Sequence, residues 1–370
     1  MTTILEELSL LLCPVGGGLI LPSSSEPAQR EVQHRLYRAT DDEGIQAGFF
    51  RELHRIPTAR AVILGIPSDV GASVVRGAAF GPLAIRRALL EAVPDWPERC
   101  VEAGVVDLGD VFVIPQFLHD DMLSEGQKAS ARGVLYPGMD PQVTARLPVS
   151  PLSMAERVFE LVLAVNPNVA PIVLGGDHST ALPALRALAR VRPGWGIVQS
   201  DAHSDLLEER LGVKYCYATW SHHANVLLGG GGKLVQVGIR NSNRDRAYWE
   251  QTHGVRQFWA EDCNTRPGEV LDALVAHVKA TGLRSIYFSN DIDGTDERHA
   301  QSTGTPEPGG LEPDFVVELI RRLGREVGLC GGDVMEVAPP VGTPEASERT
   351  VQLAVRYLRE TLGAVVGRPV

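Results

Sequence analysis

The segment "GWGIVQSDAHSDL" (194–206) joins a short apolar run to three possible metal ligands at two-residue spacing. The apolar part predicts a buried strand that ends by Ser200. In an extended chain, residues i, i+2 and i+4 point to one face, so we expect Asp201, His203 and Asp205 to converge just beyond this strand. Open parallel α/β sheets bind ligands at that edge. Carboxylates with imidazole suit manganese, nickel or zinc, whereas a capping aspartate beside an ordinary loop histidine is the alternative.

Two further segments repeat this arrangement. "RSIYFSNDIDGTD" (284–296) predicts a strand followed by a pair of aspartates on one face, and "APIVLGGDHS" (170–179) predicts a strand that ends in a diglycine and a histidine. Six ligands are more than one ion with an open coordination position needs, whereas two ions bridged by carboxylates and a shared water would use them all. The six candidate ligands are His178, Asp201, His203, Asp205, Asp291 and Asp293.

Apolar runs that predict strands alternate along the chain with amphipathic segments that predict helices. The strands are expected near 61–66, 103–108, 171–175, 196–200, 234–239, 284–289 and 332–337. The helices are expected near 82–91, 152–165, 180–191, 266–280, 313–326 and 345–363. This alternation predicts right-handed βαβ units. The fold class is therefore α/β, a three-layer αβα sandwich with a mainly parallel central sheet.

The length of 370 residues allows one large domain with additional segments. We predict a single α/β domain over 56–370, preceded by an N-terminal extension, 1–55, and interrupted by an insertion at about 112–150. Insertions of this length are commonly functional, oligomeric or disordered. Because the insertion follows a predicted strand, it should emerge at the metal-bearing edge, and we expect it to form a lid or a subunit contact.

Composition narrows the class of partner and compartment. The net charge is −11 and no Lys or Arg cluster stands out, which argues against nucleic-acid binding and mildly favours a cationic substrate. The five cysteines are scattered without CxxC spacing, which indicates a reducing compartment and no zinc ribbon. The opening "MTTILEELSLLL" carries acidic residues where a signal peptide has basic ones, and its apolar run is too short to span a membrane. We expect a cytoplasmic protein without membrane partners.

Three motifs, "GGDHS" (175–179), "DAHSD" (201–205) and "SNDIDGTD" (289–296), resemble in sequence and order the metal-binding signatures of the ureohydrolases. This family contains arginase, agmatinase, guanidinobutyrase and formimidoylglutamase, and the pattern is most similar to the agmatinase-like members. The resemblance runs from about residue 60 to the end. Further matches lie at 64–89, 105–111, 235–240, 302–311 and 331–340.

The resemblance implies an arginase-like fold and a dinuclear-metal amidinohydrolase. Such an enzyme cleaves agmatine or a related guanidino compound to urea and an amine, with a water deprotonated between two divalent ions, manganese or else nickel. Glu336 matches the family glutamate that grips the guanidinium, and Asp296 matches an acid near the metals. Alternatively, Glu336 could form an ion pair with an arginine, and Asp296 could be an ordinary turn aspartate. The resemblance also implies a homo-oligomer, trimer or hexamer.

One departure from the family concerns the residue that transfers a proton. Agmatinases carry a His-Gly-Thr run after "DAHxD" where this chain has Tyr217, Ala218 and Thr219, so the histidine commonly assigned to proton transfer is absent from its expected place. His222 and His223 follow closely, and either could take this role or simply begin a helix.

Substrate choice is narrowed only in part. Arginases often have an asparagine where this chain has Leu207, which disfavours L-arginine. Agmatine, 4-guanidinobutyrate and guanidine stay open, and Trp220 could offer an aromatic face to a small cation or simply pack in the core. Two other classes are an arginase-fold deacetylase with a single metal and a non-catalytic binding protein. Retention of all six ligands argues against both.

Overall fold

A nine-stranded sheet forms the centre of the protein in this computed structural model, which describes residues 3–20 and 25–370. The strand order is β1-β3-β2-β4-β9-β8-β5-β6-β7, and every pair is parallel except β1 with β3. The strands are β1 (Leu12–Cys13), β2 (Ala61–Ile66), β3 (Val105–Val111), β4 (Ala170–Gly175), β5 (Trp195–Ser200), β6 (Leu234–Ile239), β7 (Arg256–Trp259), β8 (Ser285–Asn290) and β9 (Leu329–Val334). The central strands are buried along their length, as expected for a parallel sheet covered on both faces.

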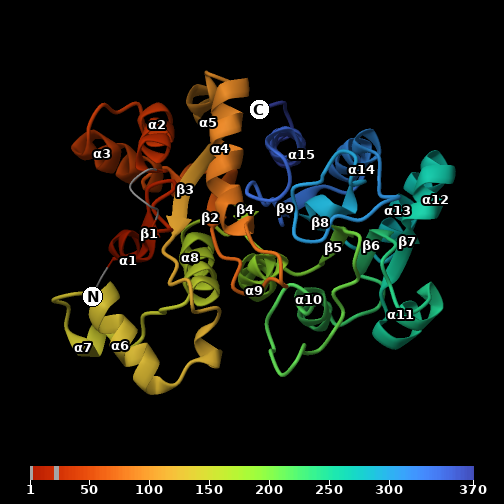
Figure 1. Ribbon diagram of the computed structural model, residues 1–370, viewed down its shortest axis with the longest axis horizontal. Helices are drawn as coiled ribbons and strands as arrows, with labels where there is room; N and C mark the ends of the chain where they lie inside the picture. Colours follow the sequence, from red (N-terminus) through yellow and green to blue (C-terminus); the bar gives the residue numbers. More distant parts are fainter. Residues whose placement is uncertain (1–2, 21–24) are drawn as a thin grey trace.

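Helices cover both faces of the sheet, which confirms the predicted three-layer α/β class (Figure 1). One layer contains α4 (Gly81–Ala92), α5 (Trp96–Ala103), α13 (Pro267–Ala280), α14 (Pro313–Glu326) and α15 (Pro344–Val366). The opposite layer contains α8 (Pro151–Val165), α9 (Leu182–Val191), α10 (Trp220–Leu228) and α11 (Arg246–His253). The short α12 (Ala260–Thr265) precedes α13.

All seven predicted strands and six predicted helices are present. The sequence patterns missed β1 and β7, which have two and four residues and are too short to show a period. They also missed α5 and α10 to α12, which have six to nine residues each. Strand β9 begins three residues before its predicted start because Cys330, Gly331 and Gly332 give little apolar signal.

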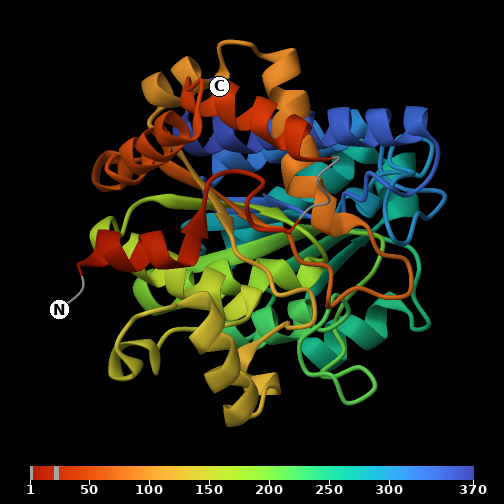
Figure 2. The same cartoon turned by 60° about the vertical axis from the view of Figure 1, so that its left-hand side comes forward.

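The N-terminal extension packs against the α/β domain. Its helices are α1 (Ile4–Leu11), α2 (Glu26–Tyr37) and α3 (Asp42–Leu53). Helix α1 packs on α8, whereas α2 and α3 pack on α4, α5 and β3 across the sheet, as Figure 2 shows. Leu8, Val32 and Phe49 are buried in the common core. The described part of the extension therefore shares one core with the α/β domain, while residues 1–2 and 21–24 lie outside the described residues.

A buried ion cluster joins the extension to the sheet. Arg86 of α4 is 2% exposed, and its guanidinium lies 2.8 Å from Asp107 and 2.7 Å from Asp110 of β3. Asp110 also accepts a hydrogen bond of 2.7 Å from the backbone N–H of Gly16. One buried arginine thus forms ion pairs with two carboxylates in the interior.

The insertion is ordered and anchored at the start of α8. It contains α6 (Glu125–Leu135) and α7 (Pro141–Thr144). The carboxylate of Asp120 accepts a hydrogen bond of 3.0 Å from the N–H of Ser150, immediately before α8. The His119 ring lies 4.6 Å from that of Tyr215, in the segment that follows the "DAHSD" run. The insertion therefore touches this segment, and its role as a lid or subunit contact stays a prediction.

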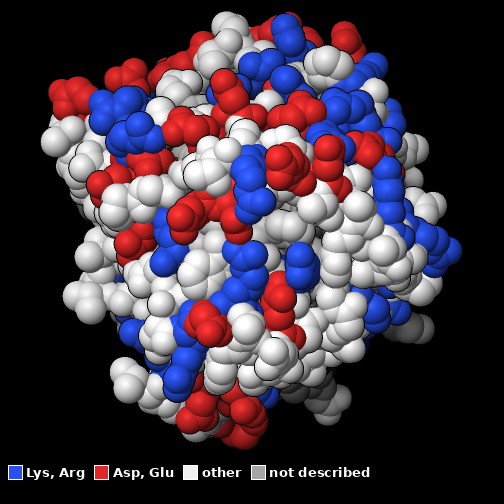
Figure 3. Space-filling view, turned by 90° about the vertical axis from the view of Figure 1, so that its right-hand side faces the viewer, with Lys and Arg blue, Asp and Glu red and all other residues white. Residues whose placement is uncertain are grey.

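The sheet topology determines where ligands can gather. Strands β4, β9, β8 and β5 are consecutive neighbours in the parallel part of the sheet, so their carboxyl ends lie side by side. Among the described residues, no helix has the length and apolar character to cross a membrane. Lys and Arg are interspersed with Asp and Glu on the face at the α11 to α13 end of the sheet (Figure 3). This face is therefore not a basic surface of the kind that binds nucleic acid.

Candidate metal centre

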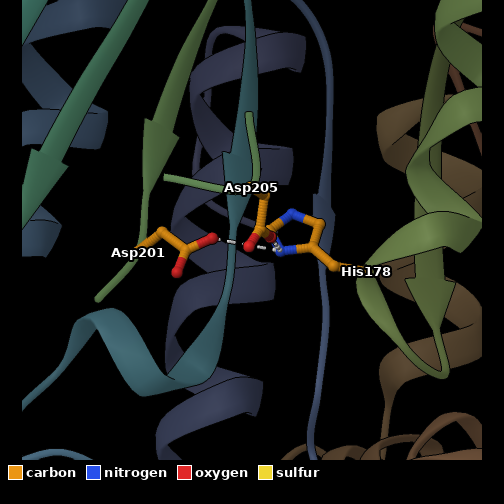
Figure 4. A group of neighbouring side chains, drawn as sticks. All are labelled: His178, Asp201 and Asp205. Atoms are coloured by element: carbon orange, nitrogen blue, oxygen red, sulfur yellow. Dashed lines mark ion pairs between the residues drawn. The ribbon is translucent and has the colours of Figure 1, made fainter. Parts of the chain in front are cut away.

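Five of the six candidate ligands form two overlapping groups at the carboxyl ends of β4, β5 and β8. The first group is His178, Asp201 and Asp205, and the second is Asp201, His203 and Asp293, with the ligand atoms of each group within 4.8 Å of one another. Figure 4 shows the first group, in which two carboxylates and an imidazole point toward one another. Asp201 belongs to both groups, so a cation bound in either group would have its carboxylate as a ligand.

The ligands converge by a different route from the one expected. Strand β5 ends at Ser200, and the chain then leaves the extended conformation, with Asp205 at a φ of +51°. A positive φ is uncommon for a residue other than glycine and turns the side chain away from the strand alternation. His203 and Asp205, predicted to share one point, therefore lie in separate groups on either side of Asp201.

His178 lies at the centre of the first group and has no exposed surface. Its Nδ1 is 3.0 Å from Asp291 Oδ2, 3.3 Å from Asp201 Oδ2 and 3.9 Å from Asp205 Oδ2. The sixth predicted ligand, Asp291, thus contacts this group through the same nitrogen.

A hydroxyl and a buried acid hold the other nitrogen of His178. Its Nε2 is 2.9 Å from Ser289 Oγ, which donates a hydrogen bond of 2.9 Å to Asp333 Oδ2. Burial raises the pKa of Asp333 to about 6. A fixed distal nitrogen leaves Nδ1 as the ligand atom, the usual way in which an outer contact orients a metal-binding histidine.

Trp220 contacts two residues of the first group. Its indole N–H donates a hydrogen bond of 2.9 Å to Asp205 Oδ2, and its ring stacks on His178 at 4.1 Å with an interplanar angle of 18°. The side chain has no exposed surface. A buried side chain with these contacts packs against the ligands and orients them. This agrees with the core-packing alternative for Trp220 and not with an aromatic face for the substrate.

The second group is more open. His203 Nδ1 is 3.2 Å from Asp293 Oδ2, and the His203 side chain is 23% exposed. Asp293 accepts hydrogen bonds from the N–H of Ala202, at 3.1 Å, and from the Thr305 hydroxyl, at 2.9 Å. These two contacts, which come from two different loops, fix the orientation of the Asp293 carboxylate.

Glu336 follows β9 and reaches the first group from the neighbouring strand. It has a φ of +61°, and its N–H donates a hydrogen bond of 2.9 Å to Gly176 O. Its Oε1 accepts a hydrogen bond of 3.0 Å from the N–H of His178. Non-glycine residues in this conformation cost of order 1–3 kcal/mol and are concentrated at functional sites.

The site holds more buried carboxylates than cations. Burial, and then repulsion from neighbouring carboxylates, raises the pKa values of Asp205, Asp291 and Glu336 well above their usual range. Burial alone would lower the pKa of His178, but Asp201 and Asp291 outweigh it and raise that pKa. Buried charges of one sign require a partner, and divalent cations would supply it. A donor set of carboxylate oxygens and imidazole nitrogens fits manganese or nickel.

Three proposed catalytic side chains do not contact either group in the hydrogen bonds of the described residues. Asp296 accepts from the N–H of Arg298 at 3.0 Å and from that of Gly310 at 2.9 Å, which is the pattern of a turn aspartate. His223 Nε2 is 2.9 Å from Lys214 O. The His222 ring packs edge-on against the rings of His223 and His253.

Sequence patterns missed the residues that orient the ligands. Ser289 precedes Asp291 by two positions and so faces the same side of β8, a signal that was available in "FSND". Asp333 and Thr305 lie in motifs that the resemblance matched, but their partners come from other strands and loops. Only the folded chain shows these contacts.

Known proteins share this architecture. The Arginase family model matches residues 59–363. The chain is 31% identical to the human mitochondrial guanidino acid hydrolase, over 93% of this chain and 86% of that protein, and 29% identical to guanidinobutyrase of Pseudomonas aeruginosa, over 83% and 86%. The crystal structure of agmatine ureohydrolase of Thermoplasma volcanium is similar with a TM-score of 0.62 and 26% identity, covering 84% of this chain and 90% of that one.

Proposed function

Because the chain belongs to the arginase family and is a hydrolase, we propose that it cleaves the C–N bond of a guanidino compound with water, releasing urea and an amine. The observation that carries this proposal is the sharing of buried Asp201 by two ligand groups. Such an arrangement suits attack of water on a planar, weakly electrophilic carbon. Relatives named for agmatine, guanidinobutyrate and guanidino acids support the guanidino class.

We assign the metal centre to His178, Asp201, His203, Asp205, Asp291 and Asp293. Two divalent cations bound there would lower the pKa of water so that it attacks near neutral pH. Hydrogen bonds orient four of these ligands: His178 contacts Ser289, and Asp205 accepts from Trp220. Asp201 accepts from Gln199, and Asp293 accepts from Thr305. The buried surroundings keep these charges out of bulk water, which strengthens their effect on the reacting atoms.

Glu336 is assigned to the guanidinium of the substrate. A carboxylate can accept two parallel hydrogen bonds from a guanidinium. One Glu336 oxygen accepts the N–H of His178, which places the carboxylate directly beside the first ligand group. The reacting carbon would then lie between this carboxylate and the metal ligands.

The Glu336→Gln variant should retain both metals and lose kcat/KM. An amide keeps the volume but cannot pair with a cation, and a hydrogen bond to a charged group contributes about 1.5–3 kcal/mol, or roughly 10- to 100-fold. Steady-state kinetics and metal content measured on the same preparation would check this. Unchanged kinetics would refute the guanidinium assignment.

Proton transfer to the departing amine is assigned to one of His222 and His223. We expect one single alanine variant to lower kcat by roughly 10²-fold or more, since general acid catalysis contributes this much, and the other to stay near wild type. The pH–rate profile of each variant should show which histidine removes an ionisation. Two variants with wild-type profiles would exclude both residues.

Substrate choice among guanidino compounds is decided by assay. Urea release should be measured with agmatine, 4-guanidinobutyrate, other guanidino acids, guanidine and L-arginine, with manganese and with nickel. We expect activity on a guanidino compound and least on L-arginine, since Leu207 replaces a polar residue of arginases. Two bound metals without urea from any compound would instead favour the binding-protein alternative or hydrolysis of another amidine or amide.

Three properties remain proposals that accompany this function. The metal is manganese or nickel, the assembly is a trimer or hexamer, and the compartment is the cytoplasm, although the human relative is named as mitochondrial. Metal analysis, light scattering and cell fractionation test them in turn.

A further inference from the structure

The distal nitrogen of His203 faces Glu307, a residue to which the sequence analysis gave no role. Glu307 Oε1 lies 3.6 Å from His203 Nε2, and the Glu307 side chain is 26% exposed. Asn241 Nδ2 lies 3.3 Å from the same nitrogen and donates a hydrogen bond to Glu307 Oε1. A carboxylate and an amide thus meet behind the ligand histidine, opposite the nitrogen that faces Asp293.

The loop that carries Glu307 is fixed relative to the second ligand group. Arg240 donates hydrogen bonds of 2.8 Å to Glu307 O and 2.7 Å to Asp293 O, so one guanidinium joins the loop to the ligand segment. Thr305, two residues before Glu307, donates to the Asp293 carboxylate at 2.9 Å. The position of Glu307 therefore follows from contacts on both sides of it.

The two groups behind His203 suit its two forms. When Nε2 lacks a hydrogen, Asn241 is the donor that faces it. When Nδ1 binds a cation, Nε2 carries the hydrogen and needs an acceptor, and Glu307 Oε1 is the carboxylate within reach after a shift of a few tenths of an ångström. An acceptor of this kind fixes the tautomer and raises the basicity of the ligand nitrogen.

We propose that Glu307 is a positioning residue that holds His203 in its metal-ligating form, as Ser289 with Asp333 holds His178. This inference rests on the proposed metal centre. It gives a role to a residue that is not one of the six ligands. The histidine of each group then has its own outer contact, the partly exposed Glu307 carboxylate for His203 and the buried Ser289 hydroxyl for His178.

The test is calorimetric titration of metal-stripped protein with Mn²⁺. Wild type should bind two equivalents per chain. Glu307→Gln should weaken one equivalent by roughly 10- to 100-fold and leave the other unchanged, the usual cost of losing an outer partner of a ligand. Glu307→Asp, which keeps the charge, should recover part of the loss. Glu208→Gln, which removes an exposed charge from the neighbouring loop, should bind as wild type does.

A second variant shows whether the effect is specific to the His203 group. Ser289→Ala should weaken one equivalent, and the double variant Glu307→Gln/Ser289→Ala should weaken both. The melting temperature of the stripped Glu307→Gln protein should equal that of stripped wild type. A lowered melting temperature with both equivalents equally weakened would assign Glu307 to loop stability alone and overturn the proposal.

The remaining outcomes separate this inference from the function on which it rests. If wild type binds two equivalents and Glu307→Gln binds both with unchanged affinity, the role of Glu307 is wrong and the metal centre stands. If wild type binds no Mn²⁺ or Ni²⁺, the metal centre falls and the role of Glu307 falls with it.

Discussion

The Asp201→Asn variant is expected to lose high affinity for both metal equivalents and to lower kcat by roughly 10³-fold or more, since metal assistance supplies several kcal/mol. Asp201 is the residue that both ligand groups share, and it has no exposed surface. Asparagine preserves its volume and can still accept the N–H of His203, so the loop should stay folded. Metal content by atomic spectroscopy and urea release on the same sample measure the two effects.

The matched control is Asp205→Asn. Asp205 belongs to the first group alone, so its replacement should weaken one equivalent and spare the other. The contrast between the two variants tests the bridging assignment itself, because both remove one buried carboxylate from the same loop. Loss of one equivalent in each variant would show that Asp201 serves a single ion.

The strands that carry the ligands were predictable because they are short apolar runs that end in polar motifs. Residues 170–175, 195–200 and 285–290 have this form, and parallel topology then brings their carboxyl ends together. The packing of the extension was not predictable. Strand β1 has two residues, and its partner in β3 lies about a hundred residues away, so no local pattern encodes that contact.

Within the site, local spacing identified the candidate ligands but wrongly placed His203 and Asp205 in one group. The alternation rule assumes an extended chain through Asp205, whereas the positive φ of that residue assigns it to a different group from His203. The contact of Glu307 with His203 is even less accessible to local sequence patterns. Its relation to His203 depends on Arg240 and Asn241, which follow another strand, so it becomes visible only when three segments are in place.

The Arg86→Met variant is expected to lower the free energy of unfolding by about 3–5 kcal/mol, the cost of leaving buried charges without their partner. Arg86 is 2% exposed, and its guanidinium donates to Asp107 at 2.8 Å and to Asp110 at 2.7 Å. Methionine keeps most of the side-chain length but none of the charge. Urea unfolding monitored by circular dichroism gives the change.

Replacement of the carboxylates provides the control. The triple variant Arg86→Met/Asp107→Asn/Asp110→Asn removes all three charges and should recover much of the loss, since a buried ion pair contributes little beyond an uncharged replacement. Metal content should stay at two equivalents in both variants because the cluster lies between α4 and β3, outside the strands that carry the ligands. A triple variant as unstable as Arg86→Met would show that packing of the arginine stem, not its charge, is responsible.

The pH dependence of the Arg86→Met deficit distinguishes charge from packing without further mutation. Burial raises the pKa of Asp110 even with Arg86 present, and removing the guanidinium would raise it further. A carboxyl group whose pKa is higher in the folded state favours folding fully only below its unfolded pKa, about 3.9, and this contribution is lost as the pH rises through the folded value. The variant should therefore lie closer to wild type at pH 5 than at pH 8. A deficit that is the same at both pH values would contradict an electrostatic origin.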